Sequence, residues 1–129
     1  MENLSRVTCL VGVYDADGGL RGELRYVVGH LLGRTECALC DVTHSPLRRK
    51  RAWDAMVVRL GIPVELVHRN EIPSDVAACV REAGLPCVVA RRADGGVETL
   101  LDRAALEALD GSVEAFERGV GEVLAARSV

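Results

Sequence analysis

The chain has 129 residues, the length of about one domain. Hydrophobic residues make up 49% of the chain and charged residues 27%, a balance typical of globular proteins that excludes general disorder. The formal net charge of −3 excludes a generally basic nucleic-acid-binding protein, and an aromatic content of 3% argues against a platform on which bases stack. We therefore expect no nucleic-acid partner and a core built mainly from aliphatic side chains.

The first half of the chain is predicted to contain one strand and two helices. Residues 7–14 form a continuous apolar run, which is typical of a strand buried on both faces. Residues 20–32 carry apolar side chains at helical spacing. Residues 34–45 are predicted to be irregular, and a second helix is expected over residues 46–60, with Ser45 as its N-cap.

The second half is predicted to contain three strands and two helical segments. In chain order these are a strand at 62–68, a helix at 74–83, strands at 86–92 and 97–101, and a mostly helical segment at 101–127 with a break near 110. Strands separated by helices pair in parallel, so only the strand at 97–101 is expected to be antiparallel. The prediction is an α/β fold with a mixed four-stranded sheet and helices on both faces.

The cysteines and the hydropathy pattern both bear on the compartment. No apolar run reaches the ~20 residues that span a bilayer, and the first residues lack the basic and apolar regions of a signal peptide. We therefore expect a cytoplasmic protein with no membrane partner and with reduced thiols. The odd number of cysteines argues against a fully paired disulfide framework. Cys9, Cys79 and Cys87 lie in apolar contexts, as expected of cysteines that fill a core.

The remaining two cysteines, Cys37 and Cys40, form a Cys-x-x-Cys motif. This spacing places two thiols within bridging or chelating reach of each other. A redox pair needs one thiol with a lowered pKa, which a helix N-terminus or a nearby cation supplies. The predicted helix and the basic run that begins at Arg48 offer both. A structural or incidental role for the two cysteines is the alternative.

The same motif could also bind a metal. The imidazole of His44 follows four residues after Cys40, and two thiolates with one imidazole suit zinc or another thiophilic metal. Asp41, Cys87 or water would have to supply the fourth ligand. The competing interpretation is that His44 has only a structural role near the start of the predicted helix.

Two charged stretches near these residues allow more than one interpretation. Asp15 and Asp17 follow the first predicted strand, where they could bind a hard cation, act as bases or cap a turn. Residues 48–51 read Arg-Arg-Lys-Arg and fall in the first turn of a predicted helix. There they could form an anion site or a solvated basic face.

The predicted path of the chain brings several of these residues to one edge of the sheet. A helix over 46–60 is about 22 Å long and must run away from the edge where the strand at 7–14 ends. The segment at 34–45 must therefore return the chain to that edge. In open α/β sheets, binding and catalytic residues usually lie at this edge, outside the carboxyl ends of the strands. The residues expected to meet there are Asp15, Asp17, Thr43, His44, Pro86 and Cys87.

The order of elements resembles the core order β-α-β-α-β-β-α of the thioredoxin-like family. The resemblance implies a single thioredoxin-like domain over residues 1–129, in which residues 34–60 are a loop–helix insertion that carries Cys37 and Cys40. It also implies that Pro86, directly before a predicted strand, is the cis-proline beside the family's active site.

Two shorter stretches add to this resemblance. Residues 13–21, Val-Tyr-Asp-Ala-Asp-Gly-Gly-Leu-Arg, resemble the Tyr-Asp-Gly-Asp-Cys-x-x-Cys motif of the DCC-type thiol–disulfide oxidoreductases. Gly18 and Arg21 stand where that group has its two redox cysteines. Residues 37–44, which contain Cys-x-Leu-Cys-Asp-x-Thr-His, are similar to a stretch found in small uncharacterised bacterial proteins.

The leading prediction is a thiol–disulfide redox protein that uses Cys37 and Cys40, with Pro86 shaping the cleft and His44 or the basic run tuning the thiolate. Its partner would be a protein or a small-molecule thiol. One alternative is a module that binds zinc or another thiophilic metal through Cys37, Cys40 and His44. Another is a non-catalytic thioredoxin-like interaction domain.

Overall fold

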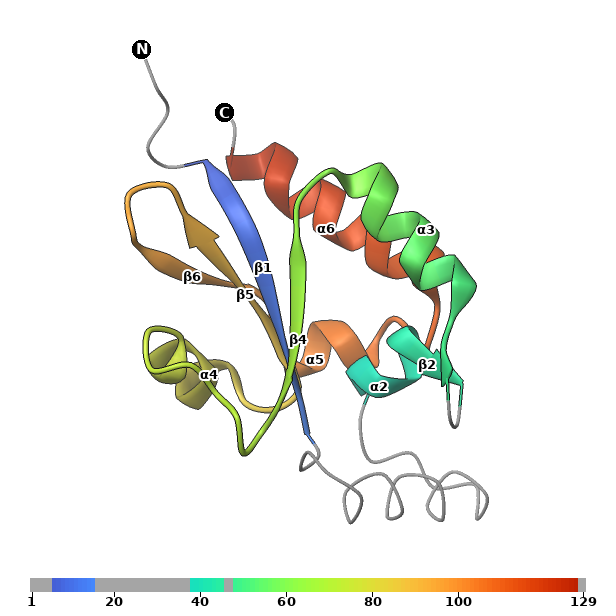
Figure 1. Ribbon diagram of the computed structural model, residues 1–129, viewed down its shortest axis with the longest axis horizontal. Helices are drawn as coiled ribbons and strands as arrows, with labels where there is room; N and C mark the ends of the chain where they lie inside the picture. Colours follow the sequence, from blue (N-terminus) through green and yellow to red (C-terminus); the bar gives the residue numbers. More distant parts are fainter. Residues whose placement is uncertain (1–5, 16–37, 46–47, 128–129) are drawn as a thin grey trace.

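The computed structural model describes residues 6–15, 38–45 and 48–127. The predicted helix at 20–32 lies outside these residues. The described elements, in chain order, are β1 (Val7–Tyr14), α2 (Ala38–Thr43), β2 (His44–Ser45), β3 (Arg48–Arg49), α3 (Arg51–Leu60), β4 (Val64–His68), α4 (Ala77–Ala83), β5 (Cys87–Arg92), β6 (Val97–Leu101), α5 (Arg103–Glu107) and α6 (Val113–Arg127) (Figure 1).

The main sheet has four strands in the spatial order β4-β1-β5-β6. Strand β1 pairs in parallel with β4 and antiparallel with β5, and β5 pairs antiparallel with β6. The predicted α/β class and the mixed four-stranded sheet are therefore confirmed. The strand predicted at 97–101 is confirmed at both ends.

The direction of β5 corrects the prediction that only the last strand is antiparallel. Tyr14 lies opposite His68, and Val13 lies opposite Cys87, so β4 ends and β5 begins at the same edge of the sheet. The helix between them, α4, has seven residues. A helix of this length spans about 10 Å, which is too short to return the chain to the opposite edge. A parallel crossover therefore cannot form here, and β5 runs back beside β1.

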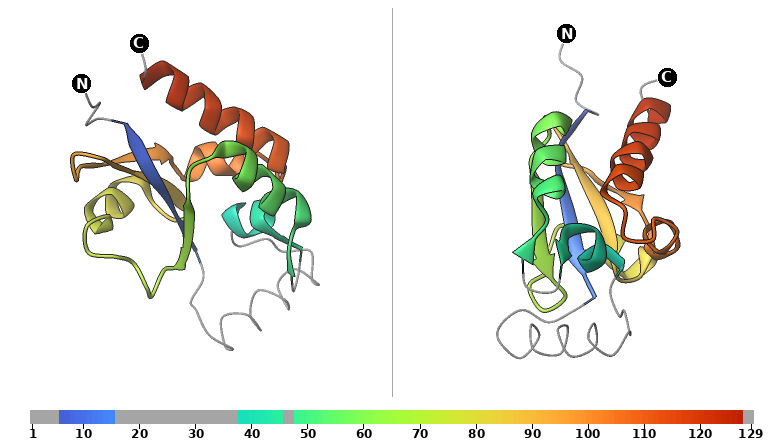
Figure 2. Two further views of the ribbon diagram at one scale, coloured as in Figure 1. Left: turned by 45° about the horizontal axis from the view of Figure 1, so that its top comes forward. Right: turned by 90° about the vertical axis from the view of Figure 1, so that its right-hand side faces the viewer.

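Helices cover both faces of the sheet, as the sequence predicts (Figure 1 and Figure 2). Successive side chains of β1 point to opposite faces and join two separate hydrophobic clusters. Leu10 and Tyr14 belong to the larger cluster, with side chains from α2, α3, α5 and α6. Val11 and Val13 belong to the smaller cluster, with side chains from α4. Strand β1 is thus buried on both faces.

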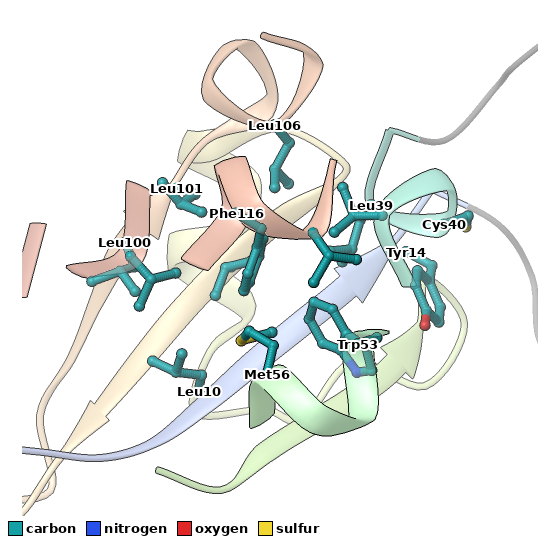
Figure 3. Packing of buried hydrophobic residues seen from close by; sticks show 14 of the residues in the cluster. Leu10, Tyr14, Leu39, Cys40, Trp53, Met56, Leu100, Leu101, Leu106 and Phe116 are labelled. Carbon is teal, nitrogen blue, oxygen red and sulfur yellow. The ribbon is translucent and has the colours of Figure 1, made fainter. Parts of the chain in front are cut away.

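The larger cluster holds the two largest fully buried side chains, Trp53 of α3 and Phe116 of α6. Their ring centroids lie 4.9 Å apart at an interplanar angle of 61°, the edge-to-face arrangement that aromatic pairs favour. Leu10 and Met56 are fully buried in the same cluster (Figure 3). This contact holds α3 and α6 together on one face of the sheet.

The segment before α3 differs most from the prediction. Residues 38–43 form helix α2 instead of an irregular loop, and α3 begins at Arg51 instead of residue 46. Ser45, the predicted N-cap, pairs with Arg48 in the two-stranded β2–β3 ribbon. The backbone N–H of Lys50 donates to the carbonyl of Thr43 at 2.8 Å and closes this ribbon.

The later start of α3 has a consequence for the basic run at 48–51. Cations in the first turn of a helix oppose its macrodipole, and the shorter helix carries only Arg51 of the four there. Lys50 caps the helix, and its ammonium donates to the carbonyl of Gly111 at 2.9 Å. The prediction that all four cations lie in the first turn of the helix is therefore wrong, and this removes the argument for the anion site, which was one of the two interpretations of the run.

The predicted ends of two helices are confirmed. Gly61 ends α3 in the left-handed conformation, at φ 72°, which glycine adopts without a steric cost. The expected break near residue 110 separates α5 from α6 at Asp110 and Gly111, both with positive φ. The side chain of Asp102 caps α5 by accepting from the backbone N–H of Ala105 at 2.9 Å.

We expect Phe116→Ala to destabilise the protein by about 3–5 kcal/mol, because it leaves a cavity beside Trp53. Val58 is 81% exposed on α3, so Val58→Ala is the matched control and should change stability by less than about 0.5 kcal/mol. Urea denaturation followed by far-UV circular dichroism measures both. Equal losses in the two variants would contradict the packing described for α3 and α6.

Candidate functional site

Helix α2 is anchored at the carboxyl end of β1 by a buried hydrogen bond. The hydroxyl of Tyr14, the last residue of β1, lies 2.9 Å from the hydroxyl of Thr43, the last residue of α2. The Thr43 hydroxyl also donates to the backbone carbonyl of Cys40 at 3.4 Å. Tyr14 is 4% exposed and Thr43 is fully buried. Thr43 therefore lies at the edge to which the predicted chain path brings it.

A glycine in the middle of β1 makes room for this helix. A Cβ atom on Gly12 would lie 2.9 Å from Cδ2 of Leu66 and 3.1 Å from Cδ2 of Leu39. Leu39 of α2 is fully buried in the larger cluster. The absence of a side chain at Gly12 therefore lets α2 pack close to β1. The close contact is made by Leu39, the residue directly before Cys40.

Cys40 is 7% exposed and belongs to the larger cluster. Figure 3 shows Cys40 and Tyr14 at the same end of that cluster, one on α2 and the other on β1. Cys37 and Asp17 lie outside the described residues. For His44 and Arg48 the structure describes the backbone, which forms the two ends of the β2–β3 ribbon.

Cys87 lies on the other face of the sheet. Its side chain is fully buried in the smaller cluster with Val89 and α4, whereas the next residue, Val88, belongs to the cluster that holds Cys40. The structure therefore separates Cys87 from Cys40 by the sheet itself. The reason is that successive side chains along β5 point to opposite faces of the sheet. The predicted chain path placed Cys87 at the correct edge but did not specify the face to which its side chain points. Cys87 is not in place to complete a metal site with Cys40.

The environment of Cys87 also disfavours an ionised thiol. Burial, together with a smaller effect of the neighbouring Cys79, raises the pKa of this thiol to about 11. A buried thiol in apolar surroundings is a poor nucleophile at neutral pH, because only the thiolate attacks.

Pro86 is buried directly before β5, and the peptide bond between Leu85 and Pro86 is cis. The position agrees with the expectation drawn from the sequence. The next residue, Cys87, pairs with Val13, so Pro86 lies at the edge where β1 ends. That edge is also the one that holds Tyr14 and the carboxyl end of α2.

Asp15 is paired with a guanidinium group. Its carboxylate lies 3.4 Å from Nη1 of Arg69, and both side chains are partly exposed. This pairing favours a role for Asp15 in an ion pair that joins the ends of β1 and β4 over a role as the ligand of a metal cation. Among residues 6–15, 38–45 and 48–127, no three histidine, cysteine, aspartate or glutamate side chains are grouped closely enough to hold a metal ion.

The last residue of β4, His68, lies beside this edge. The ring of His68 packs against the ring of Tyr14 with centroids 5.3 Å apart. Its Nδ1 lies 2.7 Å from a carboxylate oxygen of Glu71, and its backbone N–H donates to the same oxygen at 3.2 Å. These hydrogen bonds lower the pKa of Glu71. The sequence indicated only that His68 ends a strand. Its contact with Tyr14 could not be predicted, because it depends on the register between β1 and β4.

Comparisons of the chain with protein-family models, with curated proteins and with solved structures return no match. The site is therefore interpreted from its own geometry. In the part of the chain that the structure describes, no helix combines the length and apolar character needed to cross a membrane.

We expect the Tyr14–Thr43 hydrogen bond to contribute about 0.5–1.5 kcal/mol to stability, as neutral hydrogen bonds do. Tyr14→Phe and Thr43→Val each remove one hydroxyl, and the double variant removes both. Each single variant leaves one buried hydroxyl without this partner, whereas the double variant leaves none. The double variant should therefore lose less unfolding free energy than the two single variants lose together. Urea denaturation of the four proteins measures this coupling, and strictly additive losses would show that the bond does not join α2 to β1.

A second prediction concerns alkaline pH. The folded protein raises the pKa of Cys87 from 9.0 to about 11, so the stability that the neutral thiol contributes is full below pH 9 and is lost as pH rises towards 11. The difference in unfolding free energy between the wild type and Cys87→Ala should therefore shrink by roughly 2 kcal/mol over this interval. Denaturation curves at successive pH values test this, and a constant difference would contradict it.

Proposed function

We propose that the protein is a thioredoxin-like thiol–disulfide redox protein that uses Cys37 and Cys40 as its dithiol. The observation that carries this proposal is the anchoring of α2, which contains Cys40, at the carboxyl end of β1 through Tyr14 and Thr43. Pro86 enters β5 at the same edge. Functional groups gather at the carboxyl ends of strands in open α/β sheets.

The order of elements supports the fold part of the proposal. The central strand β1 has a parallel partner in β4, and the chain then continues through α4 into the β5–β6 hairpin and the helices α5 and α6. This agrees with the core order β-α-β-α-β-β-α of the thioredoxin-like family from β4 onward. The sequence departs from the DCC-type group at Gly18 and Arg21, so the dithiol of this protein comes from the 34–60 insertion.

The burial of Cys40 suits the second of two exchange steps. In the first, the Cys37 thiolate attacks a substrate disulfide, which gives a mixed disulfide and releases one substrate thiolate. In the second, the Cys40 thiolate attacks the Cys37 sulfur, which releases the second substrate thiolate and leaves Cys37 and Cys40 joined. The electron pair lost by the two protein thiols reduces the substrate. Only the first thiol has to meet substrate, and a thiol that is 7% exposed can perform the second step.

We expect Cys37→Ser to abolish reduction of insulin disulfides by the protein in the presence of dithiothreitol. Cys40→Ser should retain the first step and accumulate a mixed disulfide at Cys37, because the resolving thiol is missing. Cys9→Ser is the matched control, because Cys9 packs on the other face of the sheet, and it should keep full activity. Turnover and intact-protein mass spectrometry measure these outcomes.

Two results would overturn the redox proposal. One is a stoichiometric metal in protein purified under reducing conditions that is lost in Cys37→Ser, which would show a metal-binding module. The other is the absence of any disulfide-reductase activity together with an ordinary thiol pKa at Cys37, which would show a non-catalytic domain.

A further inference from the structure

Two cysteines that the proposed function does not use lie on the α4 face of the sheet. Cys79 follows Val76 by three residues and precedes Ala83 by four, so it shares their face of α4. That face packs against the smaller cluster, and Cys79 is partly buried in contact with it. Its side chain therefore packs towards the sheet, and the residue remains partly exposed.

Cys87 lies on the same face of the sheet as Cys79, but it belongs to strand β5 and not to helix α4. It is the first residue of β5, and its fully buried side chain belongs to the cluster that contains Val76 and Val80 of α4. Only residues 84–86 separate the end of α4 from the start of β5. Cys79 lies one helical turn before the end of α4, so the short connection keeps the two cysteines close together.

The electrostatics of the pair agree with this placement. A negative charge at Cys79 raises the pKa of Cys87, an effect that requires the two sulfur atoms to lie near each other. Cys79 and Cys87 are both free thiols in the structure. Cys40, by contrast, belongs to the cluster on the other face.

We propose that Cys79 and Cys87 are a second dithiol, which a low-molecular-weight disulfide oxidises to an intramolecular disulfide bond between α4 and β5. The Cys79 thiolate first attacks the oxidant RS–SR, which forms a mixed disulfide at Cys79 and releases RS⁻. The Cys87 thiolate then attacks the Cys79 sulfur, which closes the protein disulfide and releases a second RS⁻. The two protons lost by the protein thiols convert the released thiolates to RSH, so one disulfide is reduced as another forms.

The burial of the two thiols sets the order and the pH dependence of these steps. Cys79 reacts first because it is the partly exposed member of the pair. Cys87 reacts second and slowly, since its thiolate fraction at neutral pH is small. The rate of the closing step should rise about tenfold for each pH unit, because the attacking species is the thiolate. Burial alone thus makes Cys87 a resolving thiol that never meets the oxidant.

The test uses the full-length protein, reduced and then incubated with oxidised glutathione. We expect loss of the Cys79 and Cys87 thiols and a linked Cys79–Cys87 peptide after alkylation and digestion without reduction. Cys87→Ala should stop at a stable glutathione adduct on Cys79. Cys79→Ser should leave Cys87 unmodified, because the buried thiol does not meet the oxidant. Cys9→Ser, which changes another cysteine packed on the same cluster, should behave as the wild type does.

Three outcomes would overturn the proposal: a persistent glutathione adduct on Cys79 in the wild type, unmodified thiols at both positions, or a link from Cys79 to Cys9. The result is independent of the proposed function, because the closing reaction should proceed unchanged in Cys37→Ser. A protein that closes the Cys79–Cys87 bond but fails to reduce insulin would retain this inference and lose the function proposed for Cys37.

Discussion

The burial of β1 on both faces is the constraint on which the described structure depends. Leu10 and Tyr14 point to one face, Val11 and Val13 point to the other, and all four are buried. A strand of this kind leaves two apolar surfaces that helices must cover. Helix α4 covers one surface, while α2, α3, α5 and α6 cover the other. The Trp53–Phe116 contact then holds the larger layer together.

This division also separates the thiols. Cys40 packs in the larger layer, and Cys79 and Cys87 pack in the smaller one. The strands of the sheet therefore lie between Cys40 and the other two cysteines. Cys40 is positioned by a hydrogen-bonded helix end, whereas Cys87 is held in an apolar environment that keeps its thiol protonated.

The failed predictions concern places where a local pattern and a tertiary contact disagree. Pro46 and Ser45 have the composition of a helix start, but the basic residues that follow would crowd one positive helix end. The chain instead forms a ribbon that Lys50 closes onto Thr43, and α3 starts later. Likewise, a helix between two strands usually means a parallel crossover, but α4 is too short to complete one. Neither outcome is visible in the periodicity of hydrophobic residues.

The sequence by itself determined the α/β class, the apolar central strand, the hairpin between β5 and β6, the helix end at Gly61 and the break near residue 110, because these depend on local spacing and backbone preference. It also singled out Cys40, Pro86 and Cys87 as residues of interest. Only the tertiary structure decided which of them meet. Strand direction, register and the alternation of side chains depend on contacts between residues far apart in the chain, and these contacts put Cys87 beside Cys79 and on the opposite face from Cys40.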